Sequence, residues 1–348
     1  MNVAGFVVAA FLSGAAMAGA VADTSAVDAE VASTVVLEDR YPRAVVDLQR
    51  NVASYPDLVY FVPPGFRPLR LDLYRPKQAS KDSAGFPLVV YVHGGGWQSG
   101  HTRHAGAFAN WPAVLASLAA RGYVVASVEY RLSDEAKFPA AIQDVKTAVR
   151  WLRSRSADFD IDRRHAVIWG GSAGGQLAAL AATSCDVAAL APVIAADGKP
   201  DFTSPLATQS DCVEGLVAWY GVFDLASSSR LSGALRETAD SPESKYLGCL
   251  PSACAGTASL ASPIAHVDAQ TPPTLLIHGE LDRVVPVAQS RAFYEALKSK
   301  SIPVELMIIP GADHSFIGSS EAATRKASLA ALSKTFAFID VTLKGKRP

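Results

Sequence analysis

Short apolar runs recur along the chain between residues 69 and 277. Leu69–Tyr74 alternates apolar and polar residues, as a strand with one exposed face does, whereas Pro87–Val92 is apolar throughout. An uninterrupted apolar strand is buried on both faces and therefore needs helices above and below it. Four further runs of this second kind predict parallel strands of the same sheet: Tyr123–Val128, Ala166–Trp169, Gly215–Trp219 and Thr274–Ile277.

Segments with helical periodicity separate these strands. Apolar residues recur every three or four positions, most clearly after Phe138-Pro139, which is a typical helix start. The predicted helices are Trp111–Arg121, Pro139–Ser154, Gly174–Ala182 and Val287–Lys300. Regular alternation of strand and helix predicts an α/β fold with a mostly parallel, doubly wound sheet and helices on both faces. Ligands of such a sheet bind beyond the carboxyl ends of its strands.

Two segments interrupt the alternation, at about residues 183–211 and 226–272. Both have the composition of loops and leave the sheet on the side where the ligand site is expected. We interpret them as excursions from a single domain that spans residues 23–348. The second is long enough to form a small lid but short for an independent cap domain.

The first 22 residues have the pattern of a signal peptide. An apolar run rich in Gly and Ala ends in Ala-x-Ala patterns and gives way to polar sequence at Asp23. We therefore expect an exported protein, periplasmic or secreted. No later stretch reaches the roughly 18 apolar residues that a bilayer-spanning helix needs, so we expect no stable membrane insertion.

Composition and charge argue against nucleic acid as a partner. The chain has 348 residues, of which 49% are hydrophobic, enough to bury a large core. Its 32 basic and 33 acidic residues are interspersed and leave a formal net charge of -1. Without a basic patch, nucleic acid is not an expected partner. The oligomeric state stays open.

Four cysteines lie in the two excursions or at their ends, and none belongs to a pattern of zinc ligands. In an oxidising compartment two disulfides are the default interpretation. Four cysteines allow three connectivities, and proximity along the chain favours one of them: Cys185 with Cys212, and Cys249 with Cys254.

The candidate nucleophile is Ser172, in Gly170-Gly171-Ser172-Ala173-Gly174. The pentapeptide Gly-x-Ser-x-Gly is weak evidence alone, because glycine is common. Here an apolar strand precedes it and a helix follows it. A nucleophile elbow needs this context, since the serine must stand at a tight bend with small neighbours that leave its oxygen exposed.

A serine hydroxyl needs a base within hydrogen-bond reach and a third group that orients this base. After a nucleophile elbow these partners follow in the order acid, then histidine. Only one histidine of the sequence, His314, lies beyond residue 278, and it is in a turn directly after an apolar strand. Asp282, in the turn between a strand and a helix, is the preferred acid. Asp224 is the rival candidate for the acid. Glu280 lies two residues before Asp282, closer to the strand end. His278 ends that strand and is interpreted as structural.

Attack on a carbonyl builds negative charge on its oxygen, which N–H donors must stabilise. The sequence HGGGW at residues 93–97 follows a predicted strand and supplies a flexible loop for this task. We expect the backbone N–H groups of Gly95, Gly96 and Ala173 to form the oxyanion hole, with Trp97 as an alternative donor. Neither phosphate-binding glycine motif is present, and no cofactor is expected.

Other residues near these motifs are of types that can bind a metal or a substrate. His101 and His104 lie three residues apart without a nearby carboxylate, which favours exposed loop residues over a zinc site, so no metal is expected. Arg131 and Asp144 are expected to form a structural ion pair. Trp97 and Phe316 flank the catalytic motifs and are candidate walls of a substrate pocket, although a core role is equally compatible with their positions.

These motifs together resemble those of a known family. The chain is similar to the α/β-hydrolase carboxylesterases close to hormone-sensitive lipase, and among them to bacterial feruloyl-esterase-like enzymes. The resemblance rests on HGGGW (93–97), YRLSDEAKFPAAIQDVKTAVRWLR (130–153), IWGGSAGGQLAAL (168–180), WYGVFDL (219–225), SPESKYLG (241–248), HGELDRVVP (278–286) and PGADHSF (310–316). It implies the α/β-hydrolase fold and ester hydrolysis through an acyl-enzyme, without a cofactor, with Ser172, Asp282 and His314 as the triad.

Three functions compete at this point. The leading hypothesis is an exported serine carboxylesterase that hydrolyses short to medium acyl esters, of small molecules or of polysaccharide, with acetyl and feruloyl groups as candidates. The HGGGW loop also resembles that of kynurenine formamidases, which keeps an amidase or formamidase as the alternative. A catalytically inactive binding module is disfavoured, since such proteins usually lack a triad residue.

Overall fold

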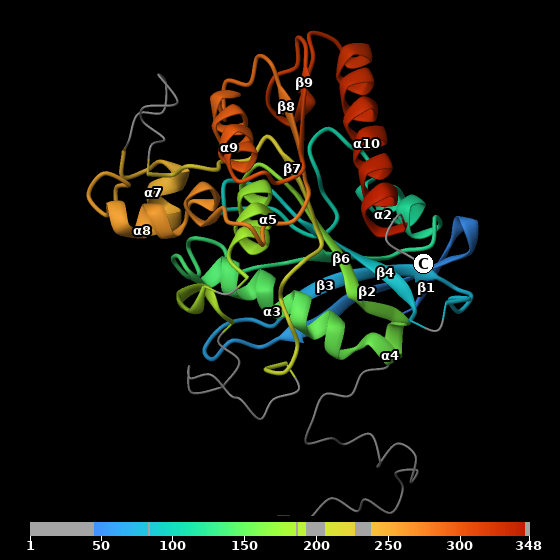
Figure 1. The fold of residues 1–348 in the computed structure, drawn as a ribbon. Helices are drawn as coiled ribbons and strands as arrows, with labels where there is room; N and C mark the ends of the chain where they lie inside the picture. The colour runs from blue at the N-terminus through green and yellow to red at the C-terminus, as the bar shows by residue number, and fades with distance from the viewer. Residues whose placement is uncertain (1–44, 83, 186, 193–205, 227–237, 345–348) are drawn as a thin grey trace, which may run out of the picture. The chain divides into compact units, whose positions relative to one another are not determined.

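A sheet of nine strands forms the centre of the described residues in the computed structural model (Figure 1). The structure describes residues 45–344 apart from 83, 186, 193–205 and 227–237. The predicted signal peptide lies outside the described residues, as do parts of both excursions. In spatial order the strands are β1 (Val46–Leu48), β2 (Val52–Phe61), β3 (Leu69–Pro76), β5 (Val124–Val128), β4 (Phe86–Val92), β6 (Ile161–Gly171), β7 (Gly215–Trp219), β8 (Thr274–Gly279) and β9 (Val304–Ile309).

The strands from β5 to β9 pair in parallel, and the strands from β1 to β5 by way of β3 pair antiparallel. The parallel part confirms the predicted α/β-hydrolase fold. Along the chain, β5 is added on one side of β4 and β6 on the other, so the direction of winding reverses at β4. The loops after β4 and β6 therefore border the crevice in which such a sheet binds its ligand.

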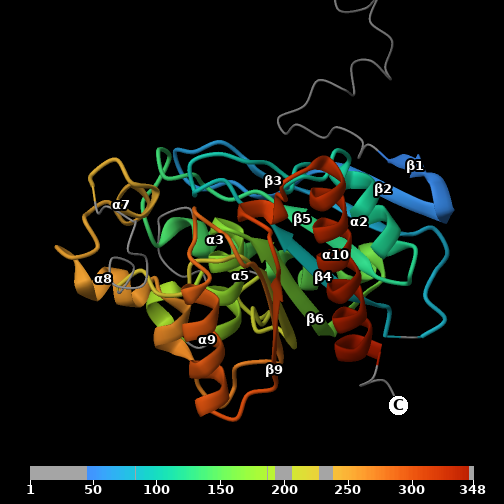
Figure 2. The same ribbon diagram turned by 90° about the horizontal axis from the view of Figure 1, so that it is seen from above.

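Helices cover both faces of this sheet (Figure 2). On one face lie α3 (Ala140–Ser154), α5 (Ala173–Thr183) and α9 (Ala288–Ser299), and on the other α2 (Trp111–Ala119) and α10 (Glu321–Lys344). Strand β4 shows how one apolar run serves both layers. Leu88 and Val90 point into the core beneath α3 and α5, whereas Val89 and Tyr91 point into the core beneath α2 and α10.

Strands β1 and β2 and helix α10 were not predicted from the sequence. Strand β2 contains Pro56 and an Asp57 with φ of 56°, and its pairing shifts register there, which hides the alternation of its side chains. The short edge strand β1 pairs with it. Helix α10 buries a stripe that includes Ser328, Thr335 and Thr342, so its buried side is not an apolar pattern in the sequence.

The second excursion has more structure than a loop. Among its described residues are α7 (Pro242–Leu247), α8 (Ala255–Leu260) and the 3-10 helix η4 (Pro263–His266), and Figure 1 shows α7 and α8 beyond α5. Tyr246 of α7 is buried and stacks on Trp97 at 4.6 Å between ring centroids. Tyr246 thus anchors α7 to the core, and the described part of this excursion contains short helices where loop structure was expected.

The cysteines pair as their spacing predicts. Cys185 is bonded to Cys212, and Cys249 to Cys254. The first bond lies beside the buried Lys146, whose ammonium group donates to the carbonyl of Ser184 and lies 3.5 Å from a carboxylate oxygen of Asp211. Each disulfide therefore cross-links one of the two excursions.

The remaining described helices are η2 (Gln49–Asn51), α4 (Ser156–Phe159), η3 (Ala188–Leu190) and η5 (His314–Phe316).

Candidate active site

Ser172 stands at a strained bend between β6 and α5. Its backbone has φ of 57° and ψ of -125°, a conformation that L-residues rarely adopt. The bend is tight, and three of the five residues of the motif are glycines. A Cβ at Gly170 would lie 2.2 Å from the carbonyl oxygen of Gly174, and one at Gly174 would lie 2.2 Å from that of Val92. The glycines of the motif are therefore required by packing as well as by the turn.

The structure brings together the three predicted triad residues. The Ser172 hydroxyl lies 3.0 Å from Nε2 of His314, and Nδ1 of His314 lies 2.8 Å from Oδ2 of Asp282. With a proton on Nδ1, the ring donates to the carboxylate, and its Nε2 accepts from the serine. This is the arrangement in which a histidine acts as general base toward a serine and an acid fixes its tautomer.

Four donors surround the carboxylate of Asp282. Its Oδ1 accepts from the backbone N–H groups of Val284 and Val285 at 2.9 and 2.8 Å. Its Oδ2 accepts from His314 and also from Nε2 of His278 at 3.2 Å. Burial raises the pKa of Asp282, but the hydrogen bonds from His278 and His314 outweigh this effect and hold the pKa well below its usual value. Asp282 is therefore an anion at neutral pH.

His278 does more than close a strand. It is fully buried, and its Nε2 also lies 2.8 Å from the carbonyl oxygen of Val285, so Nε2 must carry a proton. Its Nδ1 lies 2.6 Å from the Ser290 hydroxyl, which donates to it in the neutral ring. The prediction of a structural role for His278 does not include this contact with the acid, for which its position four residues before Asp282 is the only signal in the sequence.

The rival acids do not reach His314. Both ring nitrogens of this histidine are engaged, by Asp282 and Ser172. Asp224 is half-buried, and its backbone is held by the side chain of Gln289. Glu280 is exposed and accepts from the backbone N–H of Gly311. The geometry therefore favours Asp282 over both.

The expected oxyanion donors lie beside Ser172. Among the described residues no hydrogen bond uses the backbone N–H of Gly95, Gly96 or Ala173, and Ala173 is the first residue of α5. Gly95 and Gly96 have φ of 120° and 59°, and a Cβ at Gly95 would lie 2.1 Å from the carbonyl oxygen of Ser99. Glycine is thus needed at that position, and the loop presents unpaired N–H groups next to the serine.

The two aromatic residues expected to wall the substrate pocket lie in the core instead. Trp97 is 2% exposed, and its indole N–H donates to the side chain of Gln176 at 3.0 Å. Phe316 is 1% exposed and packs edge-on against Trp219 and Tyr220. Neither lines the cavity around Ser172. A buried ring that satisfies its own N–H or fills the core has no face left for a ligand, so this expectation is corrected.

The cavity around Ser172 has a volume of about 500 Å³ and walls of mostly small or polar residues. Tyr91 and Tyr220 supply its rings, and Tyr220 lies edge-on to His314 at 4.8 Å between centroids. His101 and His104, expected as exposed loop residues, are exposed and also line this cavity. Sequence reasoning missed both tyrosines, since only the fold places the ends of β4 and β7 beside Ser172.

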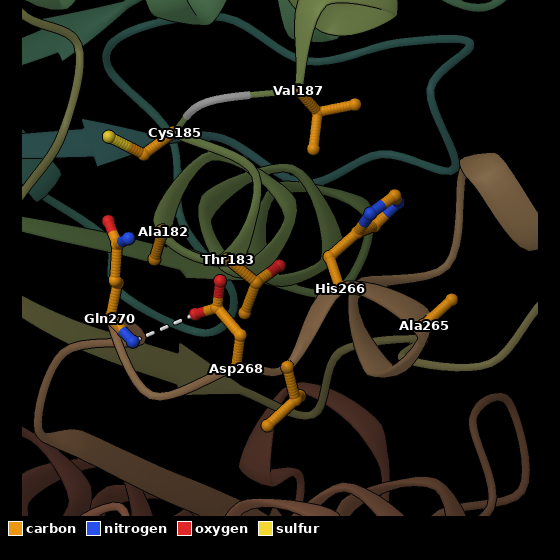
Figure 3. Close-up of a pocket in the computed structure, with 9 residues that line it drawn as sticks. Ala182, Thr183, Cys185, Val187, Ala265, His266, Asp268 and Gln270 are labelled. Atoms are coloured by element: carbon orange, nitrogen blue, oxygen red, sulfur yellow. Dashed lines mark hydrogen bonds between the residues drawn. The ribbon is translucent and has the colours of Figure 1, made fainter.

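A second cavity, of about 310 Å³, lies at the opposite end of α5 (Figure 3). Thr183, Cys185, His266, Asp268 and Gln270 are among its lining residues. An 11-residue helix is about 16 Å long, so this cavity is well separated from Ser172. Its polar groups are engaged locally: Asp268 accepts from the N–H of Gln270, and His266 bonds to the carbonyl of Leu260.

Two further expectations concern ions. Arg131 and Asp144 form the predicted ion pair, with two contacts of 2.7 and 2.8 Å between guanidinium and carboxylate. In the part of the chain that the structure describes, no group of three or more His, Cys, Asp or Glu side chains is arranged to hold a metal ion.

No helix among the described residues is long and apolar enough to cross a membrane.

Comparisons with known proteins show that the chain is similar to esterases. The BD-FAE family model matches residues 71–297. Esterase LipQ of Mycobacterium tuberculosis is 33% identical over 272 residues, which cover 77% of this chain and 58% of that protein. The chain spans little more than half the length of this and other mycobacterial esterases that it matches.

Two solved structures extend the likeness to the fold. A truncated form of a carbohydrate esterase from gut microbiota is 25% identical, with a TM-score of 0.68 over 85% of this chain and 99% of that one. A propionate-bound esterase, Est2 of the planctomycete Thermogutta terrifontis, is 27% identical, with a TM-score of 0.63 over 81% of this chain and 92% of that one.

Proposed function

Since the chain belongs to the BD-FAE family, we propose that it is a serine carboxylesterase that works through an acyl-enzyme. One observation carries the proposal: the continuous contact from Ser172 Oγ to His314 and on to Asp282, beside unpaired backbone N–H groups. The esterases to which it is similar support the reaction class.

In the proposed first half-reaction, the Ser172 oxygen attacks the ester carbonyl and His314 Nε2 takes the serine proton. The carbonyl oxygen becomes an oxyanion, which the N–H groups of Gly95, Gly96 and Ala173 stabilise. Collapse breaks the bond to the alcohol oxygen, and His314 returns the proton to that alcohol. The acyl group stays on Ser172. In the second half-reaction, water attacks with the same base, and the carboxylic acid leaves.

The cavity favours short to medium acyl groups, with acetyl and feruloyl as the candidates. Among the described residues that line the cavity, Val284 is the only branched aliphatic one, so this lining offers little surface for burying a long hydrocarbon. Each methylene removed from water stabilises binding by about 0.8 kcal/mol, which a long chain cannot gain here. A solved relative that binds propionate and another described as a carbohydrate esterase agree with this class of substrate.

A hydrolysis panel tests the proposal. It consists of 4-nitrophenyl esters from acetate to palmitate, with acetylated xylan, methyl ferulate and N-formylkynurenine. We expect kcat/KM to pass through a maximum between about two and six acyl carbons and then to fall. Rates that rise through palmitate indicate a lipase instead. Turnover of the formyl amide alone, with no ester hydrolysed, indicates the formamidase alternative.

We also propose that the protein is exported, with residues 1–22 removed. The apolar leader in the sequence supports this, as do the two disulfide pairs, because disulfides persist in oxidising compartments. Cell fractionation with N-terminal sequencing tests it. A mature protein in the periplasm or medium that starts near Asp23 and has no free thiol is expected. A protein in the cytoplasm that keeps its leader contradicts the proposal.

A further inference from the structure

The loop from Ser99 to Gly106 forms part of the wall of the cavity around Ser172. At its start, the N–H and the hydroxyl of Ser99 both donate to the carbonyl of Gly95, at 3.1 and 3.2 Å. At its end, a Cβ on Gly106 would lie 3.2 Å from the hydroxyl of Tyr220 and 3.6 Å from Cβ of Ser315, the residue after His314. One end of the loop is thus hydrogen-bonded to Gly95, an expected oxyanion donor, and the other end packs near His314, the proposed base.

The middle of this loop is held from behind by β3. Asp72 on that strand is 1% exposed, and its carboxylate accepts from the hydroxyl of Thr102 at 3.0 Å and from the guanidinium of Arg103 at 2.6 Å. The carbonyl of Thr102 in turn accepts from the hydroxyl of Ser127. These contacts engage Thr102 and Arg103 away from the cavity, and their neighbours His101 and His104 line it.

The two histidines present hydrogen-bonding groups to the cavity. Their ring centroids are 6.1 Å apart, and both residues are exposed. Nδ1 of His101 accepts from the backbone N–H of Arg103 at 3.1 Å, so the neutral ring carries its proton on Nε2. Among the described residues, neither Nε2 has a hydrogen-bond partner. A loop held from behind thus presents two histidine rings to the cavity of Ser172, where they are placed to form hydrogen bonds with oxygen atoms of a substrate.

We infer that His101 and His104 bind hydroxyl groups of the alcohol part of the ester, and thereby select esters of sugars over esters of simple alcohols. The inference rests on the proposed esterase function. An acetyl group offers no acceptor beyond its carbonyl, so in an acetyl ester the partners of the two histidines belong to the alcohol.

The experiment compares two acetate esters that form the same acyl-enzyme: 4-nitrophenyl acetate and acetylated xylobiose. The variants are His101→Leu, His104→Leu, their double variant, and His101→Gln with His104→Gln, which keep an amide donor. His266→Leu, at the opposite end of α5, is the matched control for the loss of a histidine (Figure 3). Thermal unfolding of each variant checks that it is folded.

The expected result is a change of selectivity. Two hydrogen bonds are together worth roughly a tenfold change in affinity, so the double Leu variant should lower the ratio of kcat/KM for the sugar ester to that for 4-nitrophenyl acetate by about tenfold, mainly through KM. The Gln variants should recover part of this ratio, and His266→Leu should leave it unchanged.

Three other outcomes contradict the inference. An equal loss on both esters means that the histidines support the loop rather than bind the alcohol. An unchanged ratio in a folded double variant means that they bind nothing in the substrate. If the wild-type protein hydrolyses neither ester faster than the Ser172→Ala variant, the proposed function fails first, and the inference fails with it.

Discussion

Helix α5 has a cavity at each end, and the backbone around the two differs sharply. At the Ser172 end, residues with positive φ crowd together: Gly95, Gly96, Trp97, Ser172, Tyr220, Ser315 and Phe316. At the other end, none of the described residues that line the cavity of Figure 3 has a positive φ. The polar groups there bond to each other or to nearby carbonyls.

The difference teaches that strain marks the candidate site better than the presence of a cavity does. A residue in a sparsely populated conformation raises the free energy of the fold by about 1 to 3 kcal/mol, so its neighbours must hold it in place. At the Ser172 end this strain exposes one hydroxyl and leaves N–H groups unpaired beside it. At the other end nothing comparable is held, and the lining is explained by local structure. The following predictions test this contrast.

The largest effect is expected at the triad. Ser172→Ala and His314→Ala should each lower kcat by roughly 10⁴-fold or more, and the double variant should be little worse, because these residues act as a unit. Steady-state kinetics on 4-nitrophenyl acetate measure this effect. A single variant that keeps a tenth of the wild-type rate would show that the nucleophile or the base lies elsewhere.

The next effect separates a glycine at the site from a glycine in the excursion. Gly174→Ala places a Cβ against the carbonyl oxygens of Val92 and His93, whereas Gly256→Ala in α8 meets nothing within 4 Å. The first should lower the free energy of unfolding by roughly 2 kcal/mol or more. The second should raise it by up to about 1 kcal/mol, since alanine restricts the unfolded chain. Urea unfolding measures both; equal effects would remove the packing argument for the elbow.

A pH effect of similar size is expected from His93, beneath the oxyanion loop. Burial lowers the pKa of His93 to about 4, although its hydrogen bond to the carbonyl of Gly94 opposes this effect. Between pH 6.5 and 4 the unfolded chain binds a proton that the folded protein does not, so the free energy of unfolding should fall as the pH falls. The loss amounts to about 3 kcal/mol at pH 4 and below.

Unfolding titrations of the wild type and His93→Phe at several pH values isolate this contribution. The variant should lose the part of the pH dependence that lies between pH 6.5 and 4. Parallel curves for the two proteins would mean that His93 is not held neutral by burial.

The smaller of the two effects on activity is expected at His278, which touches the acid but not the substrate. His278→Leu removes one donor from Asp282 and should lower kcat by about 10- to 100-fold through misorientation of the pair, with KM little changed. With less compensation of the carboxylate charge, the acid limb of the kcat profile should move to higher pH. His278→Gln retains a donor and should recover part of both effects. A loss of stability without a shifted pH profile would make His278 purely structural.

The sequence predicted the elements that carry the site better than the elements around it. Ser172, His314 and Asp282 sit in turns whose composition is constrained by tight bends, and such local constraints are visible in a sequence. Strand β2 and helix α10 are hidden, because a bulge and a buried stripe of Ser and Thr break the expected periodicity.

The residues that line the cavity could not be predicted, for a different reason. Trp97 and Phe316 are next to catalytic motifs in sequence but point into the two cores, whereas Tyr220 and His101 reach Ser172 only through the pairing of strands. Adjacency in sequence identifies a loop, but the direction of a side chain depends on φ, which is 57° at Trp97 and 61° at Phe316. Nothing in the residue type announces such a conformation.

Covalent labelling tests the central claim most directly. The protein is treated with a fluorophosphonate, which reacts with serines that an adjacent base activates, and the adduct is located by mass spectrometry of its peptides. The account predicts one adduct per chain, on Ser172, absent from Ser172→Ala and strongly slowed in His314→Ala but not in His266→Leu. An adduct on another residue, or equal labelling of wild type and His314→Ala, would contradict it.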